Sequence, residues 1–564
     1  MNFNDLTYQK INIDNESSKI NTMIEAFKEA TSADEQISIY MEFVTLRNIL
    51  DTMTSLCYIR FSQDTTNAFY QEQMDYVDSI SPELTALYAT MNETLLASTF
   101  KEELEHHFGS FFFEKLSIST RIYCDAIKED LKQENKLISE YNKLLSSAAI
   151  EFEGEIRNLS QMIPFMQHAN RATRKKAFEL TFGFMAAHGE AFDQLYDDLV
   201  TLRSTIAKKL GFTTFTKIGY LRMGRLDYNS TMVAAFREQV LTHIVPLANQ
   251  LIERQRKRLQ LDELKYYDIE YKFKTGNPIP QGDPAWIIEQ GLHMYDELSK
   301  ETGEFFREMY QSNLLDLVAR AGKSNGGYCA YLPAYKLPFV FSNFNGTEGD
   351  ITVLTHEIGH AFQYKLSSPI EINELANPAA ESAEIHSMSM EFLTYPWMKD
   401  FFGPDTDKFT YSHISDGILF IPYACCVDEF QHIIYEQPKL SPTERRCTWR
   451  ELERKYMPYK DYDGFDYLEK GGRWQRQAHI YEVPFYYIDY ALAQLCAYQF
   501  FVHNLESKET TWASYMKLCT LGGSKPFTHL LKEINFASPF EQGTIQSVIA
   551  TITSMLDGID DLTY

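Results

Sequence analysis

The chain has 564 residues, and 44% of them are hydrophobic, which is enough to bury large cores. With 53 basic and 78 acidic residues, its formal charge is −25 at pH 7. A charge of this sign and size argues against nucleic acid and anionic membranes as partners.

The N-terminal part of the sequence is predicted to be helical, from about residue 15 to 210. Long amphipathic stretches such as Lys175 to Leu202 contain few Gly or Pro breaks, and Leu210-Gly211 marks a helix end. The basic run 254–258 is expected to be a solvated helix face that could contact an acidic region of the same molecule. Gly and Pro cluster in 265–284, which predicts a loop before further helices.

A short strand is expected at 337–344, where aromatic and β-branched residues dominate. A strand at this position could pair with an extended peptide. Cys329 precedes it and could lie near a cleft, which would make the protein sensitive to thiol reagents. After a turn, Asp350 is a candidate N-cap, and apolar residues from Ile351 to Phe362 have helical spacing.

This helix carries the motif His356-Glu357-Ile-Gly-His360, which is a signature of zinc hydrolases. Residues four apart lie on one helix face, about 6 Å apart along the axis, so both imidazoles can bind one ion. Glu357 would lie beside the ion, where it could take a proton from the water that the ion activates and pass it to a leaving amine. The motif therefore predicts metal-assisted hydrolysis.

Two histidines leave a zinc site one protein ligand short. A second helix is expected to begin at Asn377-Pro378 and to end near Tyr395. Its glutamates Glu381, Glu384 and Glu391 fall on one stripe of that helix. Spacing alone does not choose between Glu381 and Glu384 as the third ligand.

These residues resemble the zinc oligopeptidases, a family that includes thimet oligopeptidase, oligoendopeptidase F and the Pz-peptidases, with the last two the closest branch. In that family the third ligand is the first Glu of a Glu-x-x-Ser-x-x-x-Glu run, and the segment from Glu384 to Glu391 has this form. The resemblance implies that Glu384 completes a site for one Zn²⁺ ion per chain and that Glu391 orients a ligand histidine. His386 is a less expected ligand, because two residues from Glu384 it is turned away from the same helix face.

A Tyr-rich segment follows a histidine at 479–490, as in the family. The resemblance implies that His479 binds substrate or assists the oxyanion, and that Tyr486 and Tyr490 match the family tyrosines best. Tyr481 and Tyr487 fit less well, because the segment carries an extra residue relative to the family pattern. A phenol hydroxyl aimed at the carbonyl oxygen of the peptide would stabilise the charge that builds there.

The cellular location is expected to be cytoplasmic. The eight cysteines show no disulfide spacing, so we expect free thiols, and the first residues show no secretory signal. The longest apolar-aromatic stretch, Tyr481 to Val502, is interrupted by Glu482, Pro484 and Asp489, so we expect no membrane span.

The resemblance implies a mainly α fold, in which two largely helical halves enclose a deep substrate channel with a small β-sheet near the zinc helices. We place a helical N-terminal half at 1–200 and a catalytic half at 201–564. The catalytic half would hold the zinc helices at about 350–395 and the Tyr-rich substrate segment at about 471–500.

The predicted function is that of a zinc-dependent endopeptidase, a metalloprotease that cleaves internal bonds of short unstructured oligopeptides. One alternative is a related zinc carboxypeptidase, which would need a group that binds the free C-terminus of its substrate. Another is a non-catalytic peptide-binding protein with a structural metal. It is disfavoured, because structural zinc sites usually have four protein ligands and no adjacent glutamate.

Overall fold

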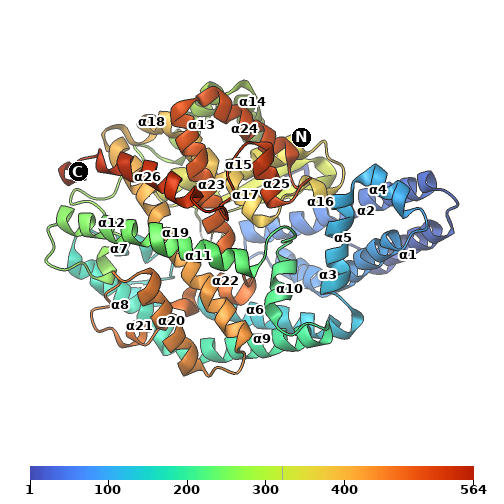
Figure 1. The fold of residues 1–564 in the computed structure, drawn as a ribbon, viewed down its shortest axis with the longest axis horizontal. Coiled ribbons are helices and arrows are strands. Elements are labelled where there is room, and N and C mark those ends of the chain that lie inside the picture. Colours follow the sequence, from blue (N-terminus) through green and yellow to red (C-terminus); the bar gives the residue numbers. More distant parts are fainter. Residues whose placement is uncertain (321, 325) are drawn as a thin grey trace. The chain divides into compact units, whose positions relative to one another are not determined.

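The computed structural model describes residues 1–320, 322–324 and 326–564, and it is mainly α-helical (Figure 1), which confirms the predicted fold class. The chain forms two compact units, each built from three segments. The first comprises Met1–Lys128, Pro280–Phe401 and Ser507–Phe536, and the second comprises Glu129–Ile279, Phe402–Glu506 and Ala537–Tyr564. The boundary expected near residue 200 falls inside a segment of the second unit. That division and the substrate channel stay predictions.

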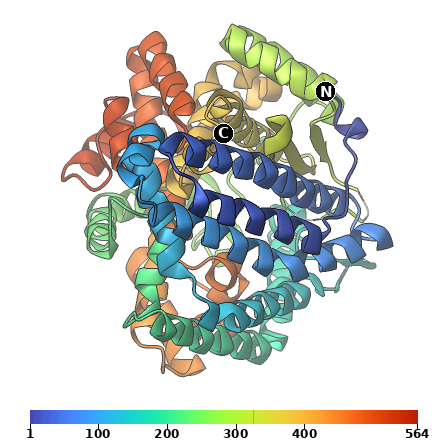
Figure 2. The ribbon, with the colours of Figure 1, turned by 90° about the vertical axis from the view of Figure 1, so that its right-hand side faces the viewer.

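The first unit begins with helices that run side by side, drawn in blue in Figure 2. The side chains of Asn12, Ser32 and Asn67 accept hydrogen bonds from backbone N–H groups in the first turns of the first three, which satisfies donors that have no partner within the helix. The helices of this segment are α1 (Ile13–Glu29), α2 (Ala33–Gln63), α3 (Ala68–Leu96), α4 (Lys101–Phe108) and α5 (Ser110–Ile122).

The middle segment of this unit holds a three-stranded sheet followed by two helices that pack together. Its elements are α13 (Pro284–Leu298), α14 (Lys300–Gln311), β3 (Leu315–Val318), β4 (Tyr328–Leu332), β5 (Leu337–Phe344), α15 (Gly349–Ser367), α16 (Asn373–Ala376), α17 (Ala380–Leu393) and α18 (Met398–Phe402). The last segment contributes α24 (Lys508–Leu521) and α25 (Phe527–Glu533), and α24 packs against α15 and α17.

The predicted strand is present as β5, the central strand of this sheet. It is parallel to β3 and antiparallel to β4, in the order β3-β5-β4. The prediction that this strand would pair with an extended peptide is wrong, because both of its edges are already paired. The outer edges of the sheet belong to β3 and β4.

The second unit contains a small hairpin that the sequence analysis missed, although the Glu153-Gly154 pair at its turn, with φ of 52° and 79°, is a recognisable signal. The expected long helix over 175–202 is two helices, which meet at His188. The elements of the unit are α6 (Lys128–Ser146), β1 (Ile150–Phe152), β2 (Glu155–Arg157), α7 (Ile163–Met166), α8 (Arg171–Ala187), α9 (Gly189–Lys209), α10 (Phe215–Arg222), α11 (Ser230–His243), α12 (Val245–Arg258), α19 (Thr406–Glu436), α20 (Pro442–Tyr456), α21 (Asp466–Glu469), α22 (Ala478–Glu482), α23 (Tyr487–Glu506) and α26 (Thr544–Asp557).

Helix α23 accounts for the long apolar-aromatic stretch of the sequence. It packs against α19 and α26, and its residues from Ala491 to Phe501 are all buried, so the stretch forms protein core. Among the described residues, no helix is long and apolar enough to cross a membrane. The basic end of α12 contacts an acidic region, as the sequence analysis allowed, because Arg254 and Arg258 both pair with Asp561. The expected solvated face is only partly present, because Gln255 and Arg258 are buried.

Candidate active site

Helices α15 and α17 are in close backbone contact at Gly359, between the two histidines of the motif. A Cβ atom built on Gly359 would lie 2.7 Å from the carbonyl oxygen of His386 and 2.7 Å from the Cα atom of Ser387. Real Cβ atoms do not come this close to backbone, so only glycine permits the contact. The absence of a side chain at this position therefore brings the histidines of α15 within reach of α17.

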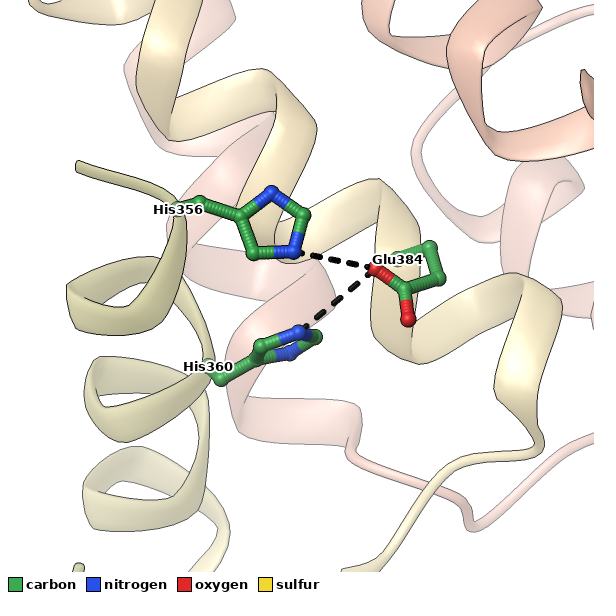
Figure 3. A group of neighbouring side chains, drawn as sticks. All are labelled: His356, His360 and Glu384. Atoms are coloured by element: carbon green, nitrogen blue, oxygen red, sulfur yellow. Dashed lines mark ion pairs between the residues drawn. The ribbon is translucent and has the colours of Figure 1, made fainter. Parts of the chain in front are cut away.

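Three side chains from these two helices form the candidate metal centre (Figure 3). His356 and His360 lie one turn apart on α15, and both face Glu384 on α17. The Nε2 atoms of the histidines lie 3.2 Å and 3.5 Å from Oε2 of Glu384. The three ligand atoms lie within 4.8 Å of one another, so the group could hold one metal ion.

The neighbours of this group orient it for metal binding. Nδ1–H of His356 donates to Oε1 of Glu391 at 2.7 Å, which leaves Nε2 as the atom that faces Glu384. The hydroxyl of Ser387 donates to Oε2 of Glu384 at 3.1 Å. Burial alone would raise the pKa of Glu384, but His360 and His356 outweigh burial and hold it well below its ordinary value. The carboxylate is therefore ionised, as a metal ligand must be.

Glu357 lies beside this group and is only 7% exposed. Burial raises its pKa, although His356 and His360 oppose the rise. Its Oε2 atom is buried and has no hydrogen-bond partner among the residues described. The backbone just before β4 lies near the other oxygen of this carboxylate. A Cβ atom built on Gly327 would lie 3.6 Å from Oε1 of Glu357. A buried carboxylate with a raised pKa and an unused acceptor is suited to take up and release a proton.

Cys329 lies near Glu357, which agrees with its expected place beside the candidate site. Burial and the nearby Glu357 carboxylate raise its pKa well above the ordinary value, which keeps the sulfur protonated. Since the thiolate is the reactive form, the raised pKa disfavours reaction, and sensitivity to thiol reagents stays a prediction.

Two other residues of α17 lie outside the metal-binding group. Glu381 is buried and is not part of the three-residue group, so geometry favours Glu384 between the two candidates. His386 is also buried, and burial lowers its pKa to about 4. Its ring lies 6.5 Å from that of Tyr515, whose hydroxyl donates to the His386 carbonyl. His386 thus has a packing role between α17 and α24.

The turn before α15 is held by Asp350, which the sequence analysis placed at the helix cap. The helix begins one residue earlier, at Gly349, and the Asp350 carboxylate instead accepts hydrogen bonds from the backbone N–H groups of Asn345 and Gly346, both at 2.8 Å. Gly346 has a φ of 85°, which favours glycine. These contacts fix the path of the chain from β5 into the helix that bears the histidines.

The second unit brings four side chains of the Tyr-rich segment together. The ring of His479 lies 5.6 Å from Tyr486, 5.0 Å from Tyr487 and 5.9 Å from Tyr490. Tyr481, by contrast, is fully buried, stacks on a neighbouring ring and donates its hydroxyl to a backbone carbonyl. The structure thus separates Tyr487, which belongs to this aromatic cluster, from Tyr481, which belongs to the core.

A buried ion pair, which the sequence analysis missed, holds the aromatic cluster in place. Arg225 donates to the carboxylate of Asp489 and to the carbonyl of Phe485, both at 2.5 Å, and the side chains of Arg225 and Asp489 are fully buried. The hydroxyl of Tyr228 donates to the same carboxylate at 3.2 Å. Phe485 has a φ of 71°, a strained value for a residue with a side chain. This residue turns the chain sharply just before α23.

Fold and site together define a peptidase with a candidate metal centre. A model of peptidase family M3 matches residues 164–278 and 288–548, and a model of the peptidase M3 N-terminal domain matches residues 3–123. The chain therefore belongs to peptidase family M3, which confirms the resemblance seen in the sequence.

Individual relatives agree with this assignment. The chain is 23% identical to oligopeptidase PepF of Bacillus subtilis (strain 168), over 95% of this chain and 82% of that protein. A solved structure of Pz peptidase A with an inhibitor superposes with a TM-score of 0.97 at 50% identity, covering 99% of this chain and 100% of that one. A structure described as an oligoendopeptidase F gives a TM-score of 0.97 at 48% identity over the whole of both chains.

The substitution Gly359→Ala is expected to force α15 and α17 apart. The added methyl group would overlap backbone, which costs about 1–3 kcal/mol and displaces the histidines from Glu384. We therefore expect a lower midpoint of thermal unfolding and a lower metal content after dialysis, and both are measured on the purified variant. Gly183→Ala is the matched control, because the position lies inside α8 with open space around it and gains helix propensity. Equal midpoints and metal contents in wild type and Gly359→Ala would contradict this account.

The substitution Asp489→Ala is expected to leave Arg225 as a buried cation without its carboxylate. Breaking a buried pair in this way costs about 3–5 kcal/mol, which would appear as a lower midpoint in urea unfolding. Glu506→Ala removes an exposed acidic residue at the end of the same helix and should change stability by less than about 0.5 kcal/mol. An equal decrease of the urea midpoint in the two variants would show that breaking the buried pair costs no more than removing an exposed carboxylate.

Proposed function

We propose that this peptidase is a zinc-dependent endopeptidase that hydrolyses internal bonds of short unstructured oligopeptides. In this proposal His356, His360 and Glu384 hold one zinc ion, and Glu357 is the general base and acid. The observation that carries the proposal is the convergence of the three ligand atoms beside a buried glutamate whose acceptor oxygen is unused.

The residues present fit zinc in number, type and spacing. Two ligand atoms that each lie about 2.1 Å from a tetrahedral zinc ion are roughly 3.4 Å apart. The distances of 3.2 Å and 3.5 Å from the histidine Nε2 atoms to Oε2 of Glu384 agree with this value. Three protein ligands are typical of catalytic zinc sites, whereas structural sites usually have four. The ligand count therefore disfavours a purely structural metal.

The chain's own residues supply the proton transfers. When bound, zinc would polarise the peptide carbonyl and lower the pKa of the attacking water. The Glu357 carboxylate would take a proton from that water and later give it to the leaving amine. Glu391 would keep the His356 ring in one orientation through its hydrogen bond to Nδ1.

His479, Tyr486 and Tyr490 are proposed to bind the substrate and to stabilise the oxyanion. Two observations support this: the resemblance assigns these roles, and the three rings lie within 6 Å of one another in one cluster. A phenol hydroxyl contributes most when it is held rigidly at the position of the developing charge. The Arg225–Asp489 pair would supply that rigidity to the turn that carries Tyr486 and to the first turn of α23, which carries Tyr490.

The substrate class is proposed from the relatives and from the sheet. The names of relatives, oligopeptidase PepF and oligoendopeptidase F, refer to short peptides. An extended peptide could add to the outer edge of β4, which begins close to Glu357. A cytoplasmic location would suit an enzyme for such peptides, and it too remains a proposal.

The test is hydrolysis of an internally quenched peptide of about ten residues that is blocked at both ends. Internal cleavage should stop with a chelator and return with added zinc. The variant Glu357→Gln should keep its zinc but lose at least about 100-fold in kcat, because it cannot accept a proton. Zinc content and kcat are measured on the same samples.

Three outcomes would contradict the proposal. Cleavage that persists in Glu357→Gln at the wild-type rate would remove the general base from the mechanism. Cleavage of an unblocked peptide only, one residue at a time from its C-terminus, would favour the carboxypeptidase alternative. Absence of hydrolysis with bound metal would favour the peptide-binding alternative.

The tyrosines are tested by Tyr486→Phe and Tyr490→Phe. Removing the hydroxyl that contacts the oxyanion should lower kcat by about 100-fold with little change in KM, because the hydrogen bond forms only in the transition state. Tyr481→Phe is the matched control, since its hydroxyl donates to a backbone carbonyl in the core. Unchanged kcat in both Tyr486→Phe and Tyr490→Phe would remove the tyrosines from the proposed mechanism.

A further inference from the structure

A cavity of about 270 Å³ lies within the second unit, and none of its lining residues is a group that the proposed chemistry uses. Aromatic side chains form much of its wall, and α19 contributes Phe420 and Tyr423 to it. Lys460 and Arg473 line it as well, from the segment that follows α20. In a chain with a formal charge of −25, a cavity lined by cations needs a physical reason.

Most charges around the cavity are already compensated. Arg258 pairs with Asp561, and Lys272 pairs with Asp416. The remaining cations of the lining are Lys460 and Arg473. Of the two acidic residues on the lining, Asp416 is the one paired with Lys272, and the other is the exposed Glu270. The cavity therefore carries an excess of positive charge.

Lys460 and Arg473 have no hydrogen-bond partner among the described residues. Each lies 4.0 Å from the buried Glu453, beyond hydrogen-bond distance, and Glu453 already accepts hydrogen bonds from Tyr462 and Arg450. The Lys460 side chain is 8% exposed, and Nε of Arg473 is buried without a partner. Burial and the neighbouring Arg473 lower the pKa of Lys460 to about 7. The Arg473 side chain as a whole is 29% exposed. Cations that are buried or half-buried with unused donors are costly unless an anion joins them.

The cavity shares a wall with the aromatic cluster of His479. The hydroxyl of Tyr423 donates to Oε1 of Gln477 at 2.7 Å, and Nε2 of Gln477 donates to Nδ1 of His479 at 2.8 Å. The rings of Phe420 and Tyr423 each lie 5.6 Å from the ring of Tyr487. A peptide held at the aromatic cluster would therefore have the cavity beside it.

We propose that this cavity is a subsite for a carboxylate of the bound peptide, which Arg473 and Lys460 would bind through charged hydrogen bonds. The planar guanidinium of arginine matches the two oxygens of a carboxylate, and lysine adds a compact charge. The carboxylate could be the C-terminus of a short peptide or the side chain of Asp or Glu. This proposal rests on the proposed function, because it assumes that His479 and its neighbours bind the substrate.

The experiment compares kcat/KM for two matched peptide pairs with the full-length zinc enzyme. One pair of quenched peptides differs only in a free or an amidated C-terminus, and the other pair only in Glu or Gln at one position. Wild type should prefer the carboxylate member of at least one pair by about tenfold, the order expected for one charged hydrogen bond. A preference in the first pair identifies the C-terminus, and a preference in the second identifies a side chain.

The preference should depend on the two cations. It should fall to within about twofold in Arg473→Gln and in Lys460→Gln, since each loses a charged donor. Glu270→Gln should increase it by removing the opposing charge. Arg454→Gln is the matched control, because this arginine is exposed on α20 and does not line the cavity. Circular dichroism confirms that each variant is folded, and two independent variants keep the test valid if one is not.

Two results would overturn the subsite: wild-type ratios near one for both pairs, or a preference that persists unchanged in both cation variants. The experiment also separates failure of the subsite from failure of the proposed endopeptidase function. If wild type cleaves neither member of a pair, calorimetric titration of the Glu357→Gln variant with the same peptides still tests the cavity, because binding needs no turnover. Tighter binding of the carboxylate peptide that is lost in Glu357→Gln/Arg473→Gln would support the subsite, and equal binding would overturn it.

Discussion

The contact between the backbones of α15 and α17 at Gly359 is the constraint on which the candidate metal centre depends. Helix geometry places His356 and His360 on one face, but only the close approach of α17 brings Glu384 to within 3.5 Å of both. The same approach allows Glu391 to accept from Nδ1 of His356. The absence of a side chain at Gly359 thus determines both the geometry of the ligand group and the hydrogen bond that orients it.

In the second unit, a buried ion pair fixes the turn that precedes α23. Arg225 joins Asp489 in α23 to the carbonyl of Phe485, whose positive φ turns the chain between α22 and α23. Such a pair contributes little net stability, because desolvation offsets most of the attraction, but it is costly to break. Its effect is to define one conformation for the turn that carries the aromatic cluster. Lys460 and Arg473 differ, because the buried lysine and the half-buried arginine have no hydrogen-bonded carboxylate.

The sequence predicted the local features well. The helix with both histidines, the strand before it, the loop over 265–284 and the helix end at Leu210-Gly211 are all present, because each depends on periodicity, turn residues or caps within a few positions. Errors arose where neighbours in space decide the outcome. The strand 337–344 is central and paired on both sides, and the stretch 175–202 is two helices, since packing overrides a continuous helical pattern.

By itself, the sequence determined the chemical class of the candidate site, because two histidines four apart on a helix and an adjacent glutamate are set by helix geometry alone. It also located the Tyr-rich segment through its resemblance to a family. Residue spacing left Glu381 and Glu384 open as the third ligand, and the geometry of the three-residue group favours Glu384, as the resemblance had implied. Only the tertiary structure separated Tyr487 from Tyr481 and revealed Arg225 and Asp489 as partners. These relations join segments that are far apart in the chain, and residue spacing carries no information about which of them meet when the chain packs.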